Sequence, residues 1–329
     1  MEKIIKLKKI FLKEGIDGYI VPKNNEFFNE YIENNEDRLK YISKFSGSFG
    51  YALILKNKNY LFVDGRYSTQ AKIESGDFFK IITLPHQMPN IILKGRKIKI
   101  GFDPKLFTKK KIEIFFKGTL CKPVAINKNL IDQIWNRNKK SKLSKFYYLP
   151  NYAIGLKFKN KLNIAVKNIK NFNADYQLIS ASENNAWLLN IRGKDSNYSP
   201  LPNCFILLDS KKNLILFANL KKISLSFKKK NKFLKIVDIK KLDIILSKIK
   251  RKKFIIDQNT CSLFYEDIIS KNNKISNYTD PIYALKSVKT QKEIEYIKRA
   301  HIYDGAALTK YLFWLKKNYD KKVITEISG

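Results

Sequence analysis

Few residues of this sequence have the types and spacing that acid–base or metal chemistry needs. Its two histidines, His86 and His301, stand far apart, and His86 lies in a proline-flanked loop with no evident partner. His301 lies on the apolar face of a predicted helix, three residues before Asp304. That spacing favours a buried His–Asp pair that orients the helix; the alternative is a catalytic base. The sequence has no cluster of histidines and carboxylates and no glycine-rich phosphate loop, so we assign no catalytic and no metal-ligating residue.

Arg66 is the candidate for ligand binding. It stands in Asp64-Gly65-Arg66-Tyr67, between a predicted hairpin and a predicted helix, and the run F-S-G-S-F-G at 45–50 precedes the same hairpin. The planar guanidinium donates two parallel hydrogen bonds, which suits a carboxylate or a carbonyl. An Asp64–Arg66 pair that locks the turn explains the same residues equally well. The sequence leaves both interpretations open.

A second pattern lies at 180–193. Ser180–Glu183 is predicted to cap a helix that carries the run A-W-L-L-N-I-R-G. We expect Trp187 to lie in the core, Gly193 to end the helix, and Arg192 to compensate the negative end of the helix dipole.

The charge is strongly basic, with 65 Lys+Arg against 29 Asp+Glu and a net charge of +36. Such a surface attracts polyanions, because neutralising phosphates releases counterions. Lysine is nevertheless spread along the whole chain together with Ile, Asn, Phe and Tyr, as A+T-rich coding produces, whereas a nucleic-acid-binding face concentrates Arg and aromatic residues. We therefore favour weak, non-specific polyanion binding.

The most basic segment, 221–253, also has a structural explanation. Four of its apolar residues share one helical face, which predicts an amphipathic helix with a solvated basic face. They are Leu242, Ile245, Leu246 and Ile249.

Cysteine usage and apolar runs bear on the compartment. The three cysteines, Cys121, Cys204 and Cys261, are far apart and form no C-x-x-C pair. That spacing excludes a disulfide framework and a structural zinc site, and it suits a reducing compartment. The N-terminal residues alternate Lys with Ile and Leu, and the longest apolar runs have five residues, far fewer than the ~20 that span a bilayer. We expect a cytoplasmic protein that does not bind membranes.

The chain is long enough for two domains of ~150 residues, and its elements occur in two similar sets. Residues 1–136 are predicted to form one α/β domain and 153–284 a second, with a polar linker at 137–152. The first set opens with an expected helix, in which Ile4, Leu7 and Phe11 share one face and Gly15 supplies the stop, and a second helix is expected at 67–75. The expected strands are 19–21, 51–55, 60–63, 99–103, 177–179, 205–208 and 214–217.

Residues 285–329 are predicted to be helical. Thr290 and Glu293 have capping-box spacing, and apolar residues then trace one helix face from Ile294 to Leu315. Thr325–Gly329 has the pattern of a further helix start.

Together these patterns resemble a known family. F-S-G-S-F-G, the hairpin and V-D-G-R-Y resemble the first domain of the proline-specific metallo-aminopeptidases (aminopeptidase P, or Xaa-Pro aminopeptidase), and Asn129–Trp135 is similar to the segment that closes that domain. A-W-L-L-N-I-R-G-K-D with Tyr198–Pro200 resembles their second domain. Lys286–Trp314 resembles the opening helices of their third, catalytic domain. The matches follow in order over essentially the whole chain.

The resemblance implies two tandem creatinase-like α/β domains with mixed sheets, followed by the first helices of a truncated "pita-bread" domain at 285–329. In the family this third domain holds two metal ions, typically Mn²⁺, which activate a hydroxide against the peptide carbonyl before a proline. Its ligands are two Asp, one His and two Glu, and none of them maps onto a residue of this chain. His301 matches a helix motif. The chain by itself is therefore expected to bind no cofactor.

By the same resemblance, the chain is the N-terminal, non-catalytic part of an enzyme that removes the residue preceding proline. Its partners would be peptides with proline in second position and a second copy in a homodimer, and Arg66 would contact the bound peptide. Two alternatives from other classes stay open: a peptide- or protein-binding pseudoenzyme, and a basic nucleic-acid-binding protein.

Overall fold

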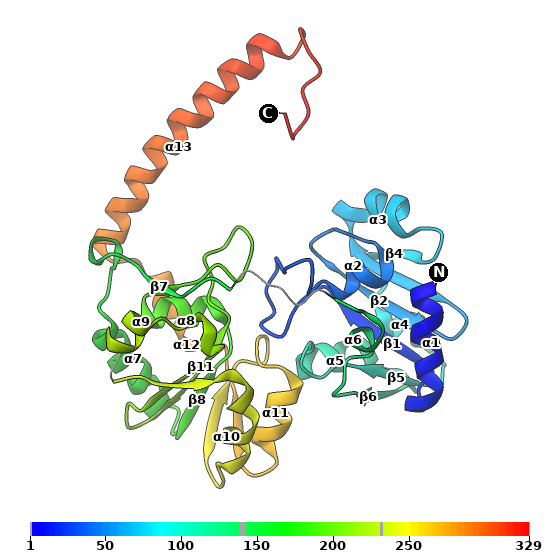
Figure 1. Ribbon diagram of the computed structural model, residues 1–329, viewed down its shortest axis with the longest axis horizontal. Coiled ribbons are helices and arrows are strands. Elements are labelled where there is room, and N and C mark those ends of the chain that lie inside the picture. The colour runs from blue at the N-terminus through cyan, green and yellow to red at the C-terminus, as the bar shows by residue number, and fades with distance from the viewer. Residues whose placement is uncertain (1, 138–142, 231–232, 329) are drawn as a thin grey trace.

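Two six-stranded mixed sheets, each covered by helices, lie side by side, and one long helix extends from the second of them (Figure 1). The computed structural model describes residues 2–137, 143–230 and 233–328. The predicted α/β class with mixed sheets is confirmed.

The first sheet has the order β4-β3-β2-β1-β5-β6. Strand β2 is antiparallel to β1 and to β3, whereas the other three pairs, β3–β4, β1–β5 and β5–β6, are parallel. The β2–β3 hairpin is the predicted one, since the polar residues 56–58 turn the chain between two buried strands. The strand bounds are β1 Gly18–Pro22, β2 Gly50–Leu55, β3 Asn59–Asp64, β4 Lys80–Leu84, β5 Lys99–Phe102 and β6 Lys122–Ala125.

Helices cover both faces of this sheet. Ile4, Leu7 and Phe11 of α1 are buried, as their spacing predicts, and pack with α2, α3 and α6 against one face. Helices α4 and α5 pack against the other face, where Phe115 is fully buried. The helix bounds are α1 Glu2–Glu14, α2 Arg38–Ser43, α3 Ser68–Ser75, α4 Pro89–Leu93, α5 Lys109–Phe116 and α6 Leu130–Ile134.

The second sheet repeats the topology of the first, with the order β12-β11-β10-β8-β13-β14. Here β10 is antiparallel to β8 and β11, and the other three pairs, β11–β12, β8–β13 and β13–β14, are again parallel. This repetition confirms the expectation of two similar tandem domains. The strand bounds are β8 Tyr176–Ile179, β10 Cys204–Asp209, β11 Leu214–Ala218, β12 Lys235–Asp238, β13 Lys253–Ile256 and β14 Lys274–Asn277.

The helices of the second domain are α7 Phe158–Asn171, α8 Ser182–Leu189, α9 Leu225–Lys230, α10 Leu242–Lys248, α11 Leu263–Ser270 and α12 Pro281–Ser287. Part of the predicted linker at 137–152 also packs here. Phe146 is buried in the core, and β7 Tyr147–Tyr148 pairs with β9 Ile191–Arg192. Residues 138–142 of that linker lie outside the described residues, and the exact boundaries stay a prediction.

The ends of α8 differ from expectation. The helix stops at Leu189 because Asn190, at φ 55°, takes the left-handed conformation that Gly193 was expected to supply. Gly193 is needed instead for a close approach, since a Cβ there would lie 2.7 Å from the Leu201 carbonyl oxygen. The predicted Arg192 role is confirmed, because its guanidinium donates to the Ala186 carbonyl oxygen over 3.2 Å.

The other end of α8 has no side-chain cap from the Ser180–Glu183 run. Its N-cap residue is Ala181, whereas the Ser180 hydroxyl bonds to that of Thr260 over 2.8 Å. The Ser180 hydroxyl therefore binds a residue distant in the sequence instead of capping α8.

The basic segment 221–253 is divided among several short elements rather than forming one lysine-rich helix. Two 3₁₀ turns, α9, β12 and α10 share it. The predicted amphipathic helix is α10, in which Leu242 and Leu246 are fully buried. The predicted structural role of these apolar residues is confirmed.

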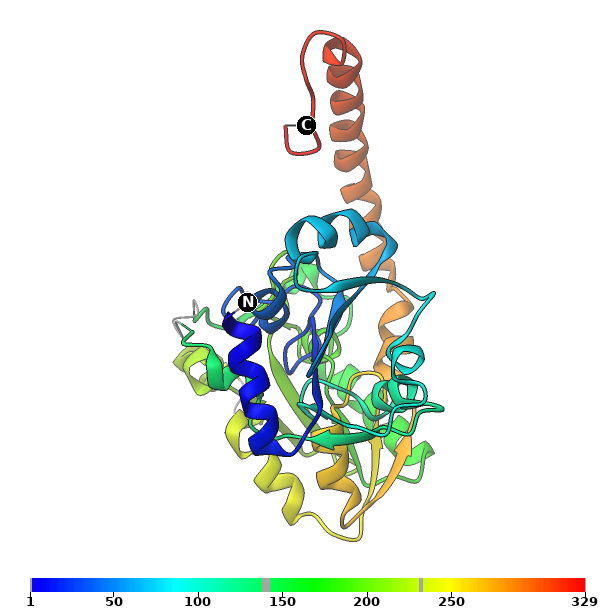
Figure 2. The same ribbon diagram turned by 90° about the vertical axis from the view of Figure 1, so that its right-hand side faces the viewer.

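Helix α13, Gln291–Asn318, begins with the predicted capping box. The Glu293 amide donates to the Thr290 hydroxyl oxygen over 3.3 Å, and the Thr290 amide donates to the Glu293 carboxylate over 2.8 Å. The helix then runs away from both domains (Figures 1 and 2). None of its described residues is buried.

The expected buried His301–Asp304 pair is wrong. Both side chains are exposed, and the His301 ring nitrogen Nδ1 lies 2.9 Å from the Ile297 carbonyl oxygen of the same helix. The reason is tertiary: no described element packs against this part of α13, so its apolar face has nothing to bury it.

Lys161 of α7 is a buried lysine that holds the C-terminus of α8. Its ammonium donates to the Trp187 carbonyl oxygen and to Asn190 Oδ1, each over 2.7 Å, and lies 4.0 Å from the centroid of the Trp187 ring. The residue is 3% exposed, and burial lowers the pKa of Lys161 from 10.5 to about 8.

Lys161 should make stability depend on pH. Between pH 8 and pH 10.5 the unfolded chain retains a proton that the folded chain has released. The free energy of unfolding therefore rises with pH in this window, by about 2–3 kcal/mol relative to Lys161→Met. Urea unfolding of both proteins across this window measures the difference. The exposed Lys167→Met, on the same helix, should show no such trend, and a pH-independent difference for Lys161→Met would contradict the assignment.

Candidate functional site

Arg66 lies in a 3₁₀ turn, η1 Gly65–Tyr67, directly after β3. Its Nε and Nη2 donate to the two carboxylate oxygens of Asp64, over 3.2 and 2.7 Å. This hydrogen-bonded guanidinium lowers the pKa of Asp64. Arg66 Nη1 has no partner among the residues that the structure describes, and the side chain is 72% exposed. The turn-locking pair thus forms and still leaves one edge of the guanidinium able to donate to a ligand.

The glycine-rich run positions this turn. The rings of Phe45 and Tyr67 meet edge to face with centroids 5.7 Å apart, and the hydroxyls of Ser48 and Tyr67 lie 2.9 Å apart. A Cβ at Gly47 would lie 2.3 Å from the Phe45 ring, and one at Gly50 would lie 2.8 Å from a β3 carbonyl oxygen. The two runs that sequence analysis singled out therefore pack on each other, and their glycines permit the close approach.

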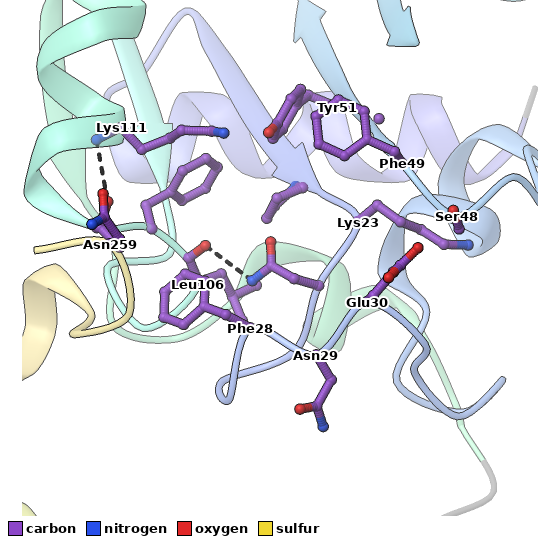
Figure 3. Close-up of a pocket in the computed structure, with 15 residues that line it drawn as sticks. Lys23, Phe28, Asn29, Glu30, Ser48, Phe49, Tyr51, Leu106, Lys111 and Asn259 are labelled. Atoms are coloured by element: carbon purple, nitrogen blue, oxygen red, sulfur yellow. Dashed lines mark hydrogen bonds between the residues drawn. The ribbon is translucent and has the colours of Figure 1, made fainter. Parts of the chain in front are cut away.

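A pocket of about 280 Å³ opens beside this turn, with Ser48 on its wall. Its walls come from the end of β1, residues 23–30, the start of β2 and the start of α5, and Asn259 of the second domain completes it (Figure 3). At one end lie Lys23, Glu30 and Ser48, where Lys23 forms a buried ion pair with Asp37. At the other end, the Lys111 ammonium and the Tyr51 hydroxyl point toward one another.

The junction of the two domains fixes the shape of this pocket. The Asn29 side-chain amide donates to the Asn203 side-chain oxygen over 2.7 Å, and both residues are buried. Nearby, the rings of Phe27 and Phe205 stack with centroids 5.1 Å apart. The Leu263 amide also donates to the Phe107 carbonyl oxygen, over 2.7 Å. Polar and apolar contacts together therefore hold the domains in one arrangement.

Sequence analysis did not find Lys111 or Tyr51. They lie 60 positions apart in α5 and β2. Tyr51 opens the predicted strand 51–55, where its type is expected for the core, and Lys111 belongs to no motif. Each type has an ordinary surface or core explanation, so only the fold shows that they meet.

The two-metal centre implied by the resemblance does not fit this part of the protein. Within 2–137, 143–230 and 233–328, no three His, Cys, Asp or Glu side chains gather in a way that could hold a metal ion. His86 and His301 are both exposed. The three cysteines are free and buried. No helix within the described residues is both long and apolar enough to cross a membrane.

Comparison with known proteins identifies both domains. Residues 3–119 and residues 136–293 each match a family model described as the Creatinase/Prolidase N-terminal domain. The chain belongs to this family. The second match begins ahead of β7, in agreement with the packing of residues 146–148 on the second domain.

Similar proteins confirm the resemblance of this chain to Xaa-Pro aminopeptidases. It is 29% identical to the Xaa-Pro aminopeptidase ApepP of Drosophila melanogaster, over 96% of the chain and 54% of the relative. It is 27% identical to Xaa-Pro aminopeptidase 2 of Rattus norvegicus, over 98% of the chain and 51% of the relative. The chain therefore spans about half the length of the curated relatives that it matches.

A solved structure supports the fold of this chain. The X-prolyl aminopeptidase of Caenorhabditis elegans, described as a cytosolic enzyme with a di-nuclear active site, superposes with a TM-score of 0.87 at 24% identity. The superposition covers 99% of this chain and 57% of that one. The expected creatinase-like tandem fold is confirmed.

Proposed function

We propose that this chain forms the N-terminal, non-catalytic part of a Xaa-Pro aminopeptidase, an enzyme that removes the residue preceding proline. The observation that carries the proposal is similarity along nearly the whole chain to about half of each Xaa-Pro aminopeptidase relative. In this proposal 285–329 begins the catalytic domain, and the rest of that domain would pack against the apolar face of α13. The two Mn²⁺ ions of the complete enzyme are held by residues outside the described part of this chain.

Arg66 supplies the chain's own contribution to substrate binding in this proposal. Asp64 holds Nε and Nη2, so the guanidinium plane is fixed before a peptide arrives. Nη1 then donates to a carbonyl or carboxylate oxygen of a peptide with proline in second position. A pre-oriented guanidinium binds a peptide with less loss of side-chain entropy than a free one.

Arg66→Lys tests this role in a longer protein that joins the chain to a catalytic half. Lysine keeps the charge but loses the planar geometry, so KM for a proline-containing peptide should rise about five- to tenfold while kcat and Tm stay unchanged. Arg96→Lys, at an exposed arginine away from the site, is the matched control and should leave KM unchanged. An unchanged KM for Arg66→Lys would show that Arg66 only locks the turn and does not bind the peptide.

The compartment, the oligomeric state and polyanion binding are further proposals. The cytoplasm suits three buried free cysteines and a structural relative described as cytosolic. A homodimer rests on the family resemblance alone. The pseudoenzyme and nucleic-acid alternatives gain no support from the relatives named above, and weak polyanion binding rests on the net charge of +36.

A further inference from the structure

Lys111 differs from most lysines of this basic chain. Its side chain is half-buried, and its ammonium has neither a hydrogen bond nor a carboxylate within 4 Å among the described residues. Three rings surround it instead, with centroids 4.9 Å away for Tyr51, 5.8 Å for Phe115 and 6.0 Å for Phe49. Burial lowers the pKa of Lys111, because the charged form loses water there. Ring faces offset only part of that cost.

Tyr51 adds a second polar group without a protein partner. The residue is 6% exposed, yet its hydroxyl has no hydrogen bond to any described residue. Burial raises the pKa of Tyr51, so the hydroxyl keeps its proton and can donate. Because the Lys111 ammonium and this hydroxyl point toward one another in the pocket, they converge on the space between them (Figure 3).

The rest of the pocket decides the class of ligand. Phe28, Phe49 and Phe107 provide apolar walls, and the volume of about 280 Å³ lies at the small end of ligand pockets. One ammonium and one hydroxyl can satisfy a single carboxylate, whereas a phosphate dianion needs more donors. The second cation in the pocket, Lys23, is already neutralised by Asp37. The match is therefore to a small monoanion with an apolar body.

We propose that this pocket binds a small molecule that carries one carboxylate on an aromatic or aliphatic body, with Lys111 and Tyr51 as its polar anchors. The ligand would also touch Asn259, which reaches the pocket from the second domain. Binding would then hold the domain junction and raise the Tm of the chain. This site goes beyond the proposed aminopeptidase role and does not depend on it.

Calorimetric titration of the full chain with N-acetyl-L-phenylalanine tests the proposal. We expect saturable binding, and at least tenfold weaker binding of N-acetyl-L-phenylalaninamide, which lacks only the charged carboxylate. Inorganic phosphate, used as a second probe, should bind more weakly than the acid. Equal binding of acid and amide, phosphate binding as tight as the acid, or no binding of the acid at millimolar concentration would overturn the proposal.

Variants assign the binding to this pocket. Lys111→Met should raise the Kd for the acid about tenfold or more, and Tyr51→Phe should raise it several-fold. Lys117→Met, at an exposed lysine just beyond the end of α5, is the matched control and should leave the Kd unchanged. Binding by Lys111→Met as tight as by the parent would place the ligand elsewhere and overturn the site. The acid–amide comparison uses the unaltered protein, so it decides the question even if a variant misfolds.

A peptide ending in phenylalanine distinguishes two sources of the same carboxylate. Binding no tighter than that of N-acetyl-L-phenylalanine supports a free small molecule, as the volume indicates. Binding more than tenfold tighter, and lost in Lys111→Met, would supersede the small-molecule form and assign the pocket to a peptide C-terminus.

Discussion

The purified 329-residue chain, supplied with Mn²⁺, should release no N-terminal residue from peptides with proline in second position. Two-metal hydrolysis requires ligands that fix both ions and place the attacking oxygen, and correctly folded supporting domains cannot replace them. The relatives are about twice as long as the stretch that they share with this chain. We therefore expect loss of the whole enzymatic acceleration, a factor of ~10⁶ or more, and no stoichiometric binding of Mn²⁺.

Two measurements check this expectation. Chromatography of a proline-containing peptide after incubation measures residue release, and metal analysis after desalting measures bound Mn²⁺. A complete Xaa-Pro aminopeptidase, assayed in parallel, is the positive control. Peptide cleavage above the buffer rate together with about two bound Mn²⁺ per chain would refute the non-catalytic assignment.

Asp280→Ala should cause a large loss of stability in the second domain. Asp280 is 3% exposed at the start of α12, and its carboxylate accepts hydrogen bonds from two buried side-chain amides. Gln177 of β8 donates over 2.8 Å and Asn184 of α8 over 2.7 Å, and the Ile282 amide donates over 3.0 Å as the helix cap. One carboxylate thus joins a strand and two helices.

The alanine variant leaves both amides buried without an acceptor and removes the cap. Those losses predict a decrease of about 3–5 kcal/mol in the free energy of unfolding. Urea unfolding followed by circular dichroism measures it. Asp238→Ala is the control: that aspartate is half-buried and caps a 3₁₀ turn through one hydrogen bond to the Lys240 amide, so about 1 kcal/mol is expected. Similar losses for the two variants would show that the Asp280 network carries little energy.

Local physics made part of this fold predictable. The spacing of Ile4, Leu7 and Phe11 specifies which face of α1 is buried, and the polar residues between β2 and β3 specify the hairpin. The capping box of α13 is likewise complete within four residues. Each of these signals involves side chains and backbone groups close in sequence, so no distant partner is needed to form them.

Tertiary packing determines the structure at positions where local sequence signals conflict or lack a partner. Gly193 and Asn190 are both residues that can end a helix, and the fold uses Asn190 because its side chain also meets Lys161 from α7. The apolar face of α13 predicts burial of His301, yet the helix projects from the fold and leaves that residue exposed. Amphipathic spacing shows that a face can be buried, but a partner surface is needed to bury it.

The candidate sites divide in the same way. Runs of neighbouring residues predicted two tandem α/β domains, the hairpin turn that carries Arg66, and the two interpretations of that arginine. The resemblance of those runs to a known family then implied that the domains are creatinase-like. The folded structure shows that the Asp64–Arg66 pair forms while Nη1 stays free, and that Lys111 lies near Tyr51 and Asn259 in one pocket. The Asp64–Arg66 contact is local, whereas Lys111, Tyr51 and Asn259 come from a helix, a strand and a second domain that are distant in the chain. The free energy that brings these distant residues together comes from burying the sheets' apolar faces rather than from any local pattern.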